Sequence, residues 1–159
     1  MQAVCELMAL ILKADDCLIY PGSPGYRAVE DFEFVTMDGR RLIVPQGFWY
    51  NGASIPAAFW QLTFTPFDPR IIEAACIHDW LYTCRSVERE IADKTLVFYM
   101  RKSPSVKIRS WLVGAAVRTF GNFAWQESLR DREYREHIFT SIIRRGKNPA
   151  DYGFAAMAN

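Results

Sequence analysis

The sequence predicts an α+β protein in which a small antiparallel N-terminal sheet is followed by a bundle of three to four helices. Two observations lead to this fold class. Up to about Tyr50 apolar residues alternate with polar ones, as in half-buried strands, and from Pro69 onwards they recur with a helical period. Half of the 159 residues are hydrophobic, so the chain is long enough and apolar enough to bury one sizeable core.

The strand predictions centre on one hairpin. Residues 29–36 place Phe32 and Phe34 on one face and acidic residues on the other, which is the pattern of a half-buried strand. Asp38-Gly39 is predicted to form a two-residue type I′ turn. Arg41–Val44 is then the return strand.

Four helices are expected in the rest of the chain, from the spacing of apolar residues and from capping residues. They span Arg70–Thr83, Ser86–Arg101, Ser105–Phe120 and Ser128–Arg145. Ser86 is the expected N-cap of the second helix, and Gly121 is the expected C-cap of the third.

The chain is predicted to divide at the start of the last helix. Residues 1–127 form a single α+β domain, and residues 128–159 form a charged C-terminal helix and tail that docks on a partner. The last helix carries a narrow apolar stripe that includes Tyr134, Ile138 and Ile142. Such a stripe beside so many charges is not expected to form its own core, so it should bury against another protein chain.

The charge balance argues against a protein that mainly wraps nucleic acid. Nineteen basic and eighteen acidic residues give a net charge of +1, so no specific nucleic-acid partner is expected. No apolar run reaches the roughly 18 residues of a membrane-spanning helix. The apolar stretch Ala3–Leu12 is interpreted as a helix or strand packed on the body rather than a secretory signal, because Glu6 interrupts it.

The residues with the clearest chemical potential are His78 and Asp93. His78 lies seven positions before Arg85 and Asp93 seven positions after Ser86, so an antiparallel helix pair with its turn there brings the two side chains level. A buried Asp that orients a His makes a general base. The alternative is a structural clip, in which the same hydrogen bond joins two helices and does no chemistry.

A second candidate is the loop Asn51-Gly52-Ala53-Ser54-Ile55-Pro56. Asn51, Gly52 and Ser54 are small polar residues at a strand end, where backbone groups are accessible to a ligand. With Tyr82 they are the candidate ligand-binding residues. The alternative is a turn in which Ser54 caps a helix that starts near Pro56.

Several short motifs follow one another in a recognisable order. They are Asn51-Gly52-Ala53-Ser54-Ile55-Pro56, His78-Asp79-Trp80-Leu81-Tyr82, Ala92-Asp93 and Val117-Arg118-Thr119-Phe120-Gly121 with Trp125. The chain resembles a family of small phage and prophage proteins, domain-of-unknown-function family 1353. The resemblance covers about Phe32 to Trp125, and it implies that the loop and the His-Asp helix lie together in one concave site.

The helix pair also resembles, more weakly, the core of phospholipase A2 enzymes, which carry His-Asp-x-x-Tyr on one helix and a second Asp on its neighbour. This resemblance implies that His78 activates water, Asp79 binds calcium and Asp93 orients His78. No cofactor beyond such a divalent cation is indicated. The glycine-rich calcium loop of those enzymes is missing from the sequence, so Asn51-Gly52-Ala53-Ser54 would have to replace it.

Two functions from different classes follow from these resemblances. The first is a virion-associated protein of a tailed phage, in its tail, baseplate or assembly machinery, located in the virion or the host cytoplasm. Other phage structural proteins would then bind residues 128–159, and the His-Asp cluster would be structural. The second is a small phage hydrolase, esterase-like, lipase-like or cell-envelope-degrading, with His78 as the base.

Overall fold

The described part of the chain forms short strands followed by helices, which confirms the α+β class. The computed structural model describes residues 11–14, 25–50, 68, 70–102, 106–107, 109–127 and 132–154. The strands are β1 (Ile11–Ala14), β2 (Gly25–Ala28), β3 (Phe32–Val35), β4 (Arg41–Val44) and β5 (Trp49–Tyr50). The helices are α2 (Ile72–Cys84), α3 (Arg89–Arg101), α4 (Ser110–Glu127), α5 (Arg132–Arg144) and the 3-10 turn η3 (Pro149–Tyr152).

The strands pair as two small antiparallel sheets. One has the order β1-β2-β5, and the other is the predicted hairpin of β3 and β4. In the hairpin Phe32 is opposite Val44 and Phe34 is opposite Leu42, and all four side chains are buried. The alternation that predicted this strand therefore selects the buried face correctly.

The hairpin turn differs from the prediction. Thr36 and Arg40 pair through Thr36 N–H and the Arg40 carbonyl (2.9 Å), so the loop has three residues, 37–39. Of these only Gly39 has a positive φ, +86°, whereas a type I′ turn needs a positive φ at both central residues. The wider loop is stabilised by α3, because the Met37 N–H donates to Thr95 Oγ1 at 3.0 Å.

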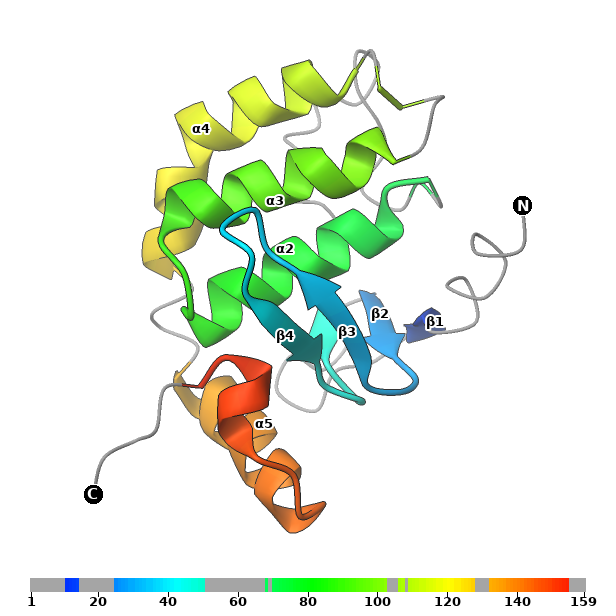
Figure 1. The fold of residues 1–159 in the computed structure, drawn as a ribbon, viewed down its shortest axis with the longest axis vertical. Helices are drawn as coiled ribbons and strands as arrows, with labels where there is room; N and C mark the ends of the chain where they lie inside the picture. The colour runs from blue at the N-terminus through cyan, green and yellow to red at the C-terminus, as the bar shows by residue number, and fades with distance from the viewer. Residues whose placement is uncertain are drawn as a thin grey trace.

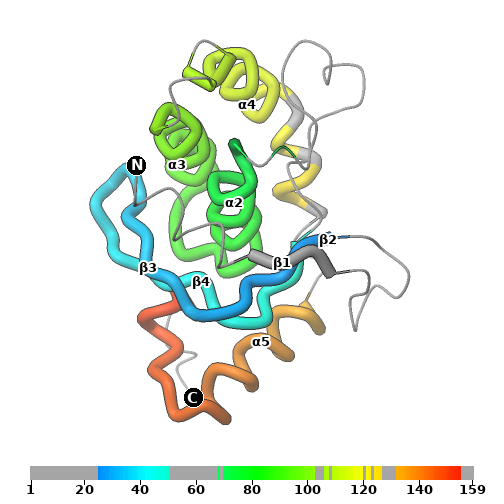
Figure 2. The backbone as a smooth tube through the Cα atoms, turned by 90° about the vertical axis from the view of Figure 1, so that its right-hand side faces the viewer, coloured from blue at the N-terminus to red at the C-terminus, as the bar shows by residue number. Residues whose placement is uncertain are grey.

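The strands lie between two groups of helices. Helices α2, α3 and α4 stack on one side of the strand layer, and α5 and η3 lie on the other (Figures 1 and 2). Phe48, at the centre, contacts the ring of Trp80 on α2 edge-to-face and the ring of Tyr134 on α5. The core therefore continues from the first group of helices through the strands to the last helix.

Two helix ends differ from their predictions. Helix α3 begins at Arg89 with Glu88 as its N-cap residue, while the Ser86 hydroxyl lies 3.3 Å from the Cys84 thiol and caps nothing. Helix α4 passes through Gly121 and continues to Glu127, so Gly121 is not a C-cap.

The prediction that the apolar stripe of the last helix needs another chain is wrong. Tyr134, Ile138 and Ile142 are all buried within this chain. The Tyr134 hydroxyl accepts a hydrogen bond from the Trp49 N–H (2.6 Å) and donates to the Trp49 carbonyl (3.1 Å). Phe154, beyond the helix, packs edge-to-face on Trp80. A narrow stripe is enough because the strand layer supplies the opposite surface.

The described helices include none that is long and apolar enough to span a membrane. Of the four cysteines, Cys76 and Cys84 are buried free thiols on α2, and Cys5 and Cys17 lie outside the described residues.

Candidate active site

The α2–α3 hairpin brings His78 and Asp93 together as the spacing predicts. His78 Nε2 lies 3.1 Å from Asp93 Oδ1. Both residues are buried, with exposed fractions of 9% and 3%. The predicted contact is therefore confirmed.

Asp93 has two further partners besides His78. The Tyr82 hydroxyl, one turn after His78 on α2, donates to the same Oδ1 at 2.7 Å. The Arg89 guanidinium, one turn before Asp93 on α3, lies 3.5 Å from Oδ2. Oδ2 makes no hydrogen bond within the described part of the chain, so the guanidinium is its nearest compensating charge.

Gly121 makes room for this arrangement from the third helix. A Cβ atom at this position would lie 2.9 Å from the Tyr82 hydroxyl and 3.1 Å from Arg89 Nη1. Arg89 Nη1 also donates to the Val117 carbonyl at 3.3 Å, which ties α3 to α4. The glycine therefore permits three helices to converge on one carboxylate, and this is the reason α4 carries it in mid-helix.

The partners of Asp93 determine its charge. Burial would raise the pKa of Asp93, but the hydrogen bonds from His78 and Tyr82 and the charges of His78 and Arg89 hold it below its usual value. Burial would lower the pKa of His78, but the neighbouring carboxylate of Asp79 and the hydrogen bond and charge of Asp93 raise it above 6.5. Asp93 is thus an ionised carboxylate that accepts a hydrogen bond from the Nε2–H of His78. When His78 is neutral, its proton is therefore on Nε2 and its lone pair is on Nδ1.

Asp79 lies on the Nδ1 side of the imidazole. Its Oδ1 is 3.7 Å from His78 Nδ1, which is too long for a hydrogen bond. Burial raises the pKa of Asp79, and the attraction to His78 offsets only part of this effect. The Asp79 side chain is nevertheless 20% exposed, against 4% for that of Asp93, so the site is more open beyond Nδ1 than beyond Nε2.

Aromatic rings enclose the dyad on its Tyr82 side. The rings of His78 and Tyr82 are 4.2 Å apart between centroids, and the Trp125 ring of α4 packs edge-to-face on Tyr82 at 4.8 Å. The Arg85 guanidinium covers the Trp125 ring at 3.6 Å, and its Nη2 donates to the Trp125 carbonyl. The Tyr82 ring therefore packs against the imidazole and is itself held by Trp125.

The structure places four of the predicted site residues together: His78, Asp79, Tyr82 and Asp93. The other three, Asn51, Gly52 and Ser54, lie outside the described residues, and so does the predicted contact between their loop and His78. The sequence reasoning missed Arg89 and Gly121. The spacing of Arg89 and Asp93, four residues apart on one helix, was an available signal for an ion pair.

The fold and the site define a class of α+β protein in which a helix hairpin holds a buried His-Asp pair beneath a third helix. The chain belongs to the DUF1353 family, described as proteins of unknown function, whose model matches residues 26–117. A relative from Sinorhizobium fredii, uncharacterized protein y4jT, is 33% identical over 100 residues, which is 62% of this chain and 29% of the relative. The chain therefore spans less than a third of that relative's length. No solved structure matches the chain significantly.

Proposed function

We propose that the protein is a hydrolase in which His78 acts as a general base toward water and Asp93 holds and polarises the imidazole. One observation carries this proposal: the carboxylate binds Nε2, and Nδ1 faces the more exposed side of the site without a hydrogen bond among the described residues. In the proposed reaction, the water and the substrate approach this free nitrogen from the Asp79 side.

The chemistry would be ester hydrolysis in two steps. His78 Nδ1 takes a proton from a water molecule while the water oxygen bonds to the ester carbonyl carbon. The tetrahedral intermediate then collapses by breaking the bond to the alkoxide, which takes the proton from Nδ1. Asp93 stays ionised throughout and stabilises the imidazolium that exists between the two steps.

A divalent cation such as calcium is implied by the weaker resemblance, and the described residues do not by themselves fit one. Calcium takes about six to eight oxygen ligands. Asp79 supplies one carboxylate beside Nδ1, and the described part of the chain contains no group of three or more His, Cys, Asp or Glu residues placed to hold a metal ion.

The test is hydrolysis of p-nitrophenyl esters of increasing acyl length by the purified protein, with and without added calcium. His78→Asn should lower kcat/KM by about 10²–10⁴, the usual contribution of a positioned base. The activity of the unaltered protein should rise with pH through the pKa of His78, above the ordinary 6.5, because only the neutral imidazole accepts a proton.

His137→Asn is the matched control, because His137 is exposed on α5 and far from the dyad in sequence. This variant should retain full activity. No hydrolysis of any ester, or equal activity of His78→Asn and the unaltered protein, would overturn the proposal. The structural-clip alternative predicts instead that His78→Asn costs about 1–3 kcal/mol of stability and changes no reaction.

A virion-associated role stays a prediction from the family resemblance. One of its supports was a tail that needed a partner chain, and the buried stripe of α5 removes that support. A phage protein can nevertheless be both virion-associated and an enzyme. Mass spectrometry of purified particles would test the association independently of any esterase assay.

A further inference from the structure

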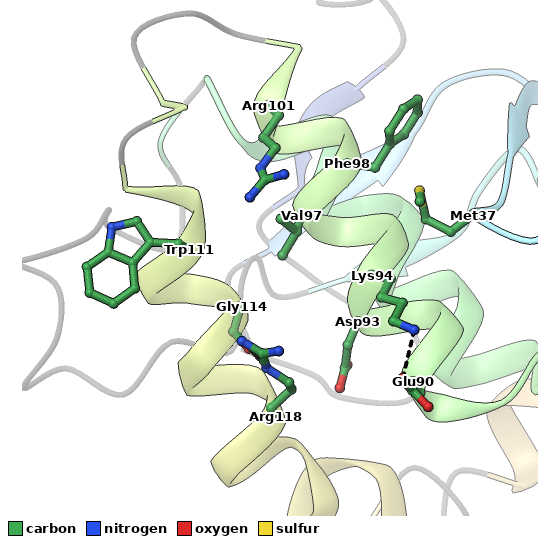
Figure 3. A pocket seen from close by; sticks show the side chains of 10 residues that line it. All are labelled: Met37, Glu90, Asp93, Lys94, Val97, Phe98, Arg101, Trp111, Gly114 and Arg118. Carbon is green, nitrogen blue, oxygen red and sulfur yellow. Dashed lines mark hydrogen bonds and ion pairs between the residues drawn. The ribbon is translucent and has the colours of Figure 1, made fainter.

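A groove runs between the outer faces of α3 and α4, and one end of it reaches Asp93 (Figure 3). Its volume is about 310 Å³, at the lower end of the range for small-molecule sites. Val97 and Gly114 lie where the two helices come together, and larger side chains from both helices surround them.

The groove carries large apolar side chains that the fold leaves exposed. Trp111 of α4 is 59% exposed, and Phe98 of α3 and Met37 of the hairpin loop are 44% and 48% exposed. Figure 3 shows Trp111 on one side of the groove and Phe98 with Met37 on the other. Exposed apolar residues that gather around one concavity, rather than being scattered singly, indicate a binding surface.

The charges at the groove are predominantly unmatched cations. Arg101 donates its Nε to Ser110 Oγ (3.3 Å) and Arg118 donates its Nε to the Gly114 carbonyl (3.1 Å). Their terminal guanidinium nitrogens have no partner among the described residues at the groove. Glu90 is paired with Lys94 at 2.7 Å, so these two charges balance each other. Two guanidinium groups therefore remain to attract an anion.

The two ends of the groove differ in their acidic neighbours. Arg118 lies at the end where Glu90 and Asp93 also line the groove, whereas Arg101 lies beside Ser110 and Trp111, with no carboxylate among the lining residues there. The lining residues span seven residues of α4, from Trp111 to Arg118, and eleven residues of α3, from Glu90 to Arg101, so the groove is about 10–16 Å long. This length accommodates a molecule of two fused rings.

We propose that this groove binds a small organic anion with a flat aromatic body, whose ring lies against Trp111 and whose sulfonate, phosphate or carboxylate group pairs with Arg101. Asp93 lines the groove, but Arg101 lies eight residues further along α3, so the anion contact is away from the dyad. The proposal does not depend on the proposed hydrolase activity. The aromatic side chains provide the contact area, and the guanidinium provides a bidentate anion contact.

The test uses naphthalene-2-sulfonate and its neutral isostere naphthalene-2-sulfonamide, neither of which is an ester. Binding to the full chain is measured by ligand-observed NMR titration at low and high salt. The sulfonate should bind at least about tenfold more tightly than the sulfonamide, and this difference should shrink at high salt. Arg101→Gln should abolish the difference, and Trp111→Ala should weaken both ligands by about tenfold.

Three results would overturn the proposal: equal affinity for the two ligands, no effect of Arg101→Gln, or no detectable binding of the sulfonate. Arg132→Gln removes an exposed arginine of α5 and is the matched control, which should bind normally. His78→Asn should also bind normally. Loss of esterase activity with retained sulfonate binding would therefore separate this site from the proposed catalytic one.

Discussion

Gly121→Ala tests whether three helices converge on Asp93 as tightly as the structure indicates. The added Cβ would lie 2.9 Å from the Tyr82 hydroxyl, closer than Cβ atoms approach other heavy atoms in proteins, and 3.1 Å from Arg89 Nη1. Both groups hold the Asp93 carboxylate, so neither can move without weakening that contact. Alanine gains about 1 kcal/mol of helix propensity over glycine. Overpacking costs about 1–3 kcal/mol and a weakened hydrogen bond to a charged group about 1.5–3 kcal/mol.

The net expectation for Gly121→Ala is a destabilisation of about 1.5–5 kcal/mol, or a decrease in Tm of about 3–20 °C for a chain of this size. Urea denaturation and thermal scans at pH 7 measure both quantities. Asn122→Ala, at the next and exposed position of α4, is the control and should be neutral or slightly stabilising. A Gly121→Ala protein that is more stable than the unaltered chain would refute the reasoning, because only the propensity gain would then operate.

Three further predictions concern the Tyr82 hydroxyl, the Asp31 carboxylate and the last helix. Tyr82→Phe keeps the ring but removes the hydroxyl that donates to Asp93, so the pKa of Asp93 should rise in an NMR titration and stability should fall by about 1–2 kcal/mol. Asp31→Asn removes a carboxylate whose pKa is held below 3.8 by hydrogen bonds from the Gln46 N–H, Arg145 and Tyr152 against the opposing effect of burial. Because the pKa of Asp31 is lower in the folded state, its ionised form stabilises the protein above pH 3.8, and this stabilisation is lost as the pH falls through the pKa of the folded state. Urea denaturation should therefore give a lower free energy of unfolding for Asp31→Asn at pH 7, and a smaller decrease of that free energy on acidification. Deletion of residues 128–159 should prevent folding, because it removes Tyr134, Ile138, Ile142 and other buried side chains. Each of these contributes about 1.5–3 kcal/mol to the stability of the fold. A cooperative unfolding transition of the remaining fragment, followed by circular dichroism, would contradict this prediction.

The contact of His78 with Asp93 was predictable because helix geometry is fixed. The rise per residue places two positions that are equally far from a tight turn at the same level, whatever the rest of the fold does. The hairpin strands were predictable for a similar reason, since the period of two defines a buried face. In both cases the argument needs only neighbours in sequence and one short connection.

The role of Gly121 was not predictable in the same way. A glycine late in a helical pattern is typical of a C-cap, and the alternative, close packing against another helix, depends on which helix lies there. The stripe of α5 presents the same difficulty. Its apolar residues indicate that the helix is buried on one side, but the sequence does not distinguish a strand layer of the same chain from the surface of another protein.

The convergence on Asp93 bears on whether the dyad is a clip or a catalytic pair. A clip between two helices needs one hydrogen bond, and a buried ion pair is a weak source of stability that apolar side chains can often replace. Here two donors bind the same carboxylate oxygen and a guanidinium lies beside the other, so the ionised form of Asp93 is favoured despite burial.

An ionised Asp93 fixes the direction of its hydrogen bond with His78, because Nε2 has to donate. The free lone pair of neutral His78 then lies on Nδ1, toward Asp79 and the more exposed side of the site. The network therefore fixes the tautomer as well as the position of the imidazole, and a fixed tautomer is a requirement of a general base but not of a clip.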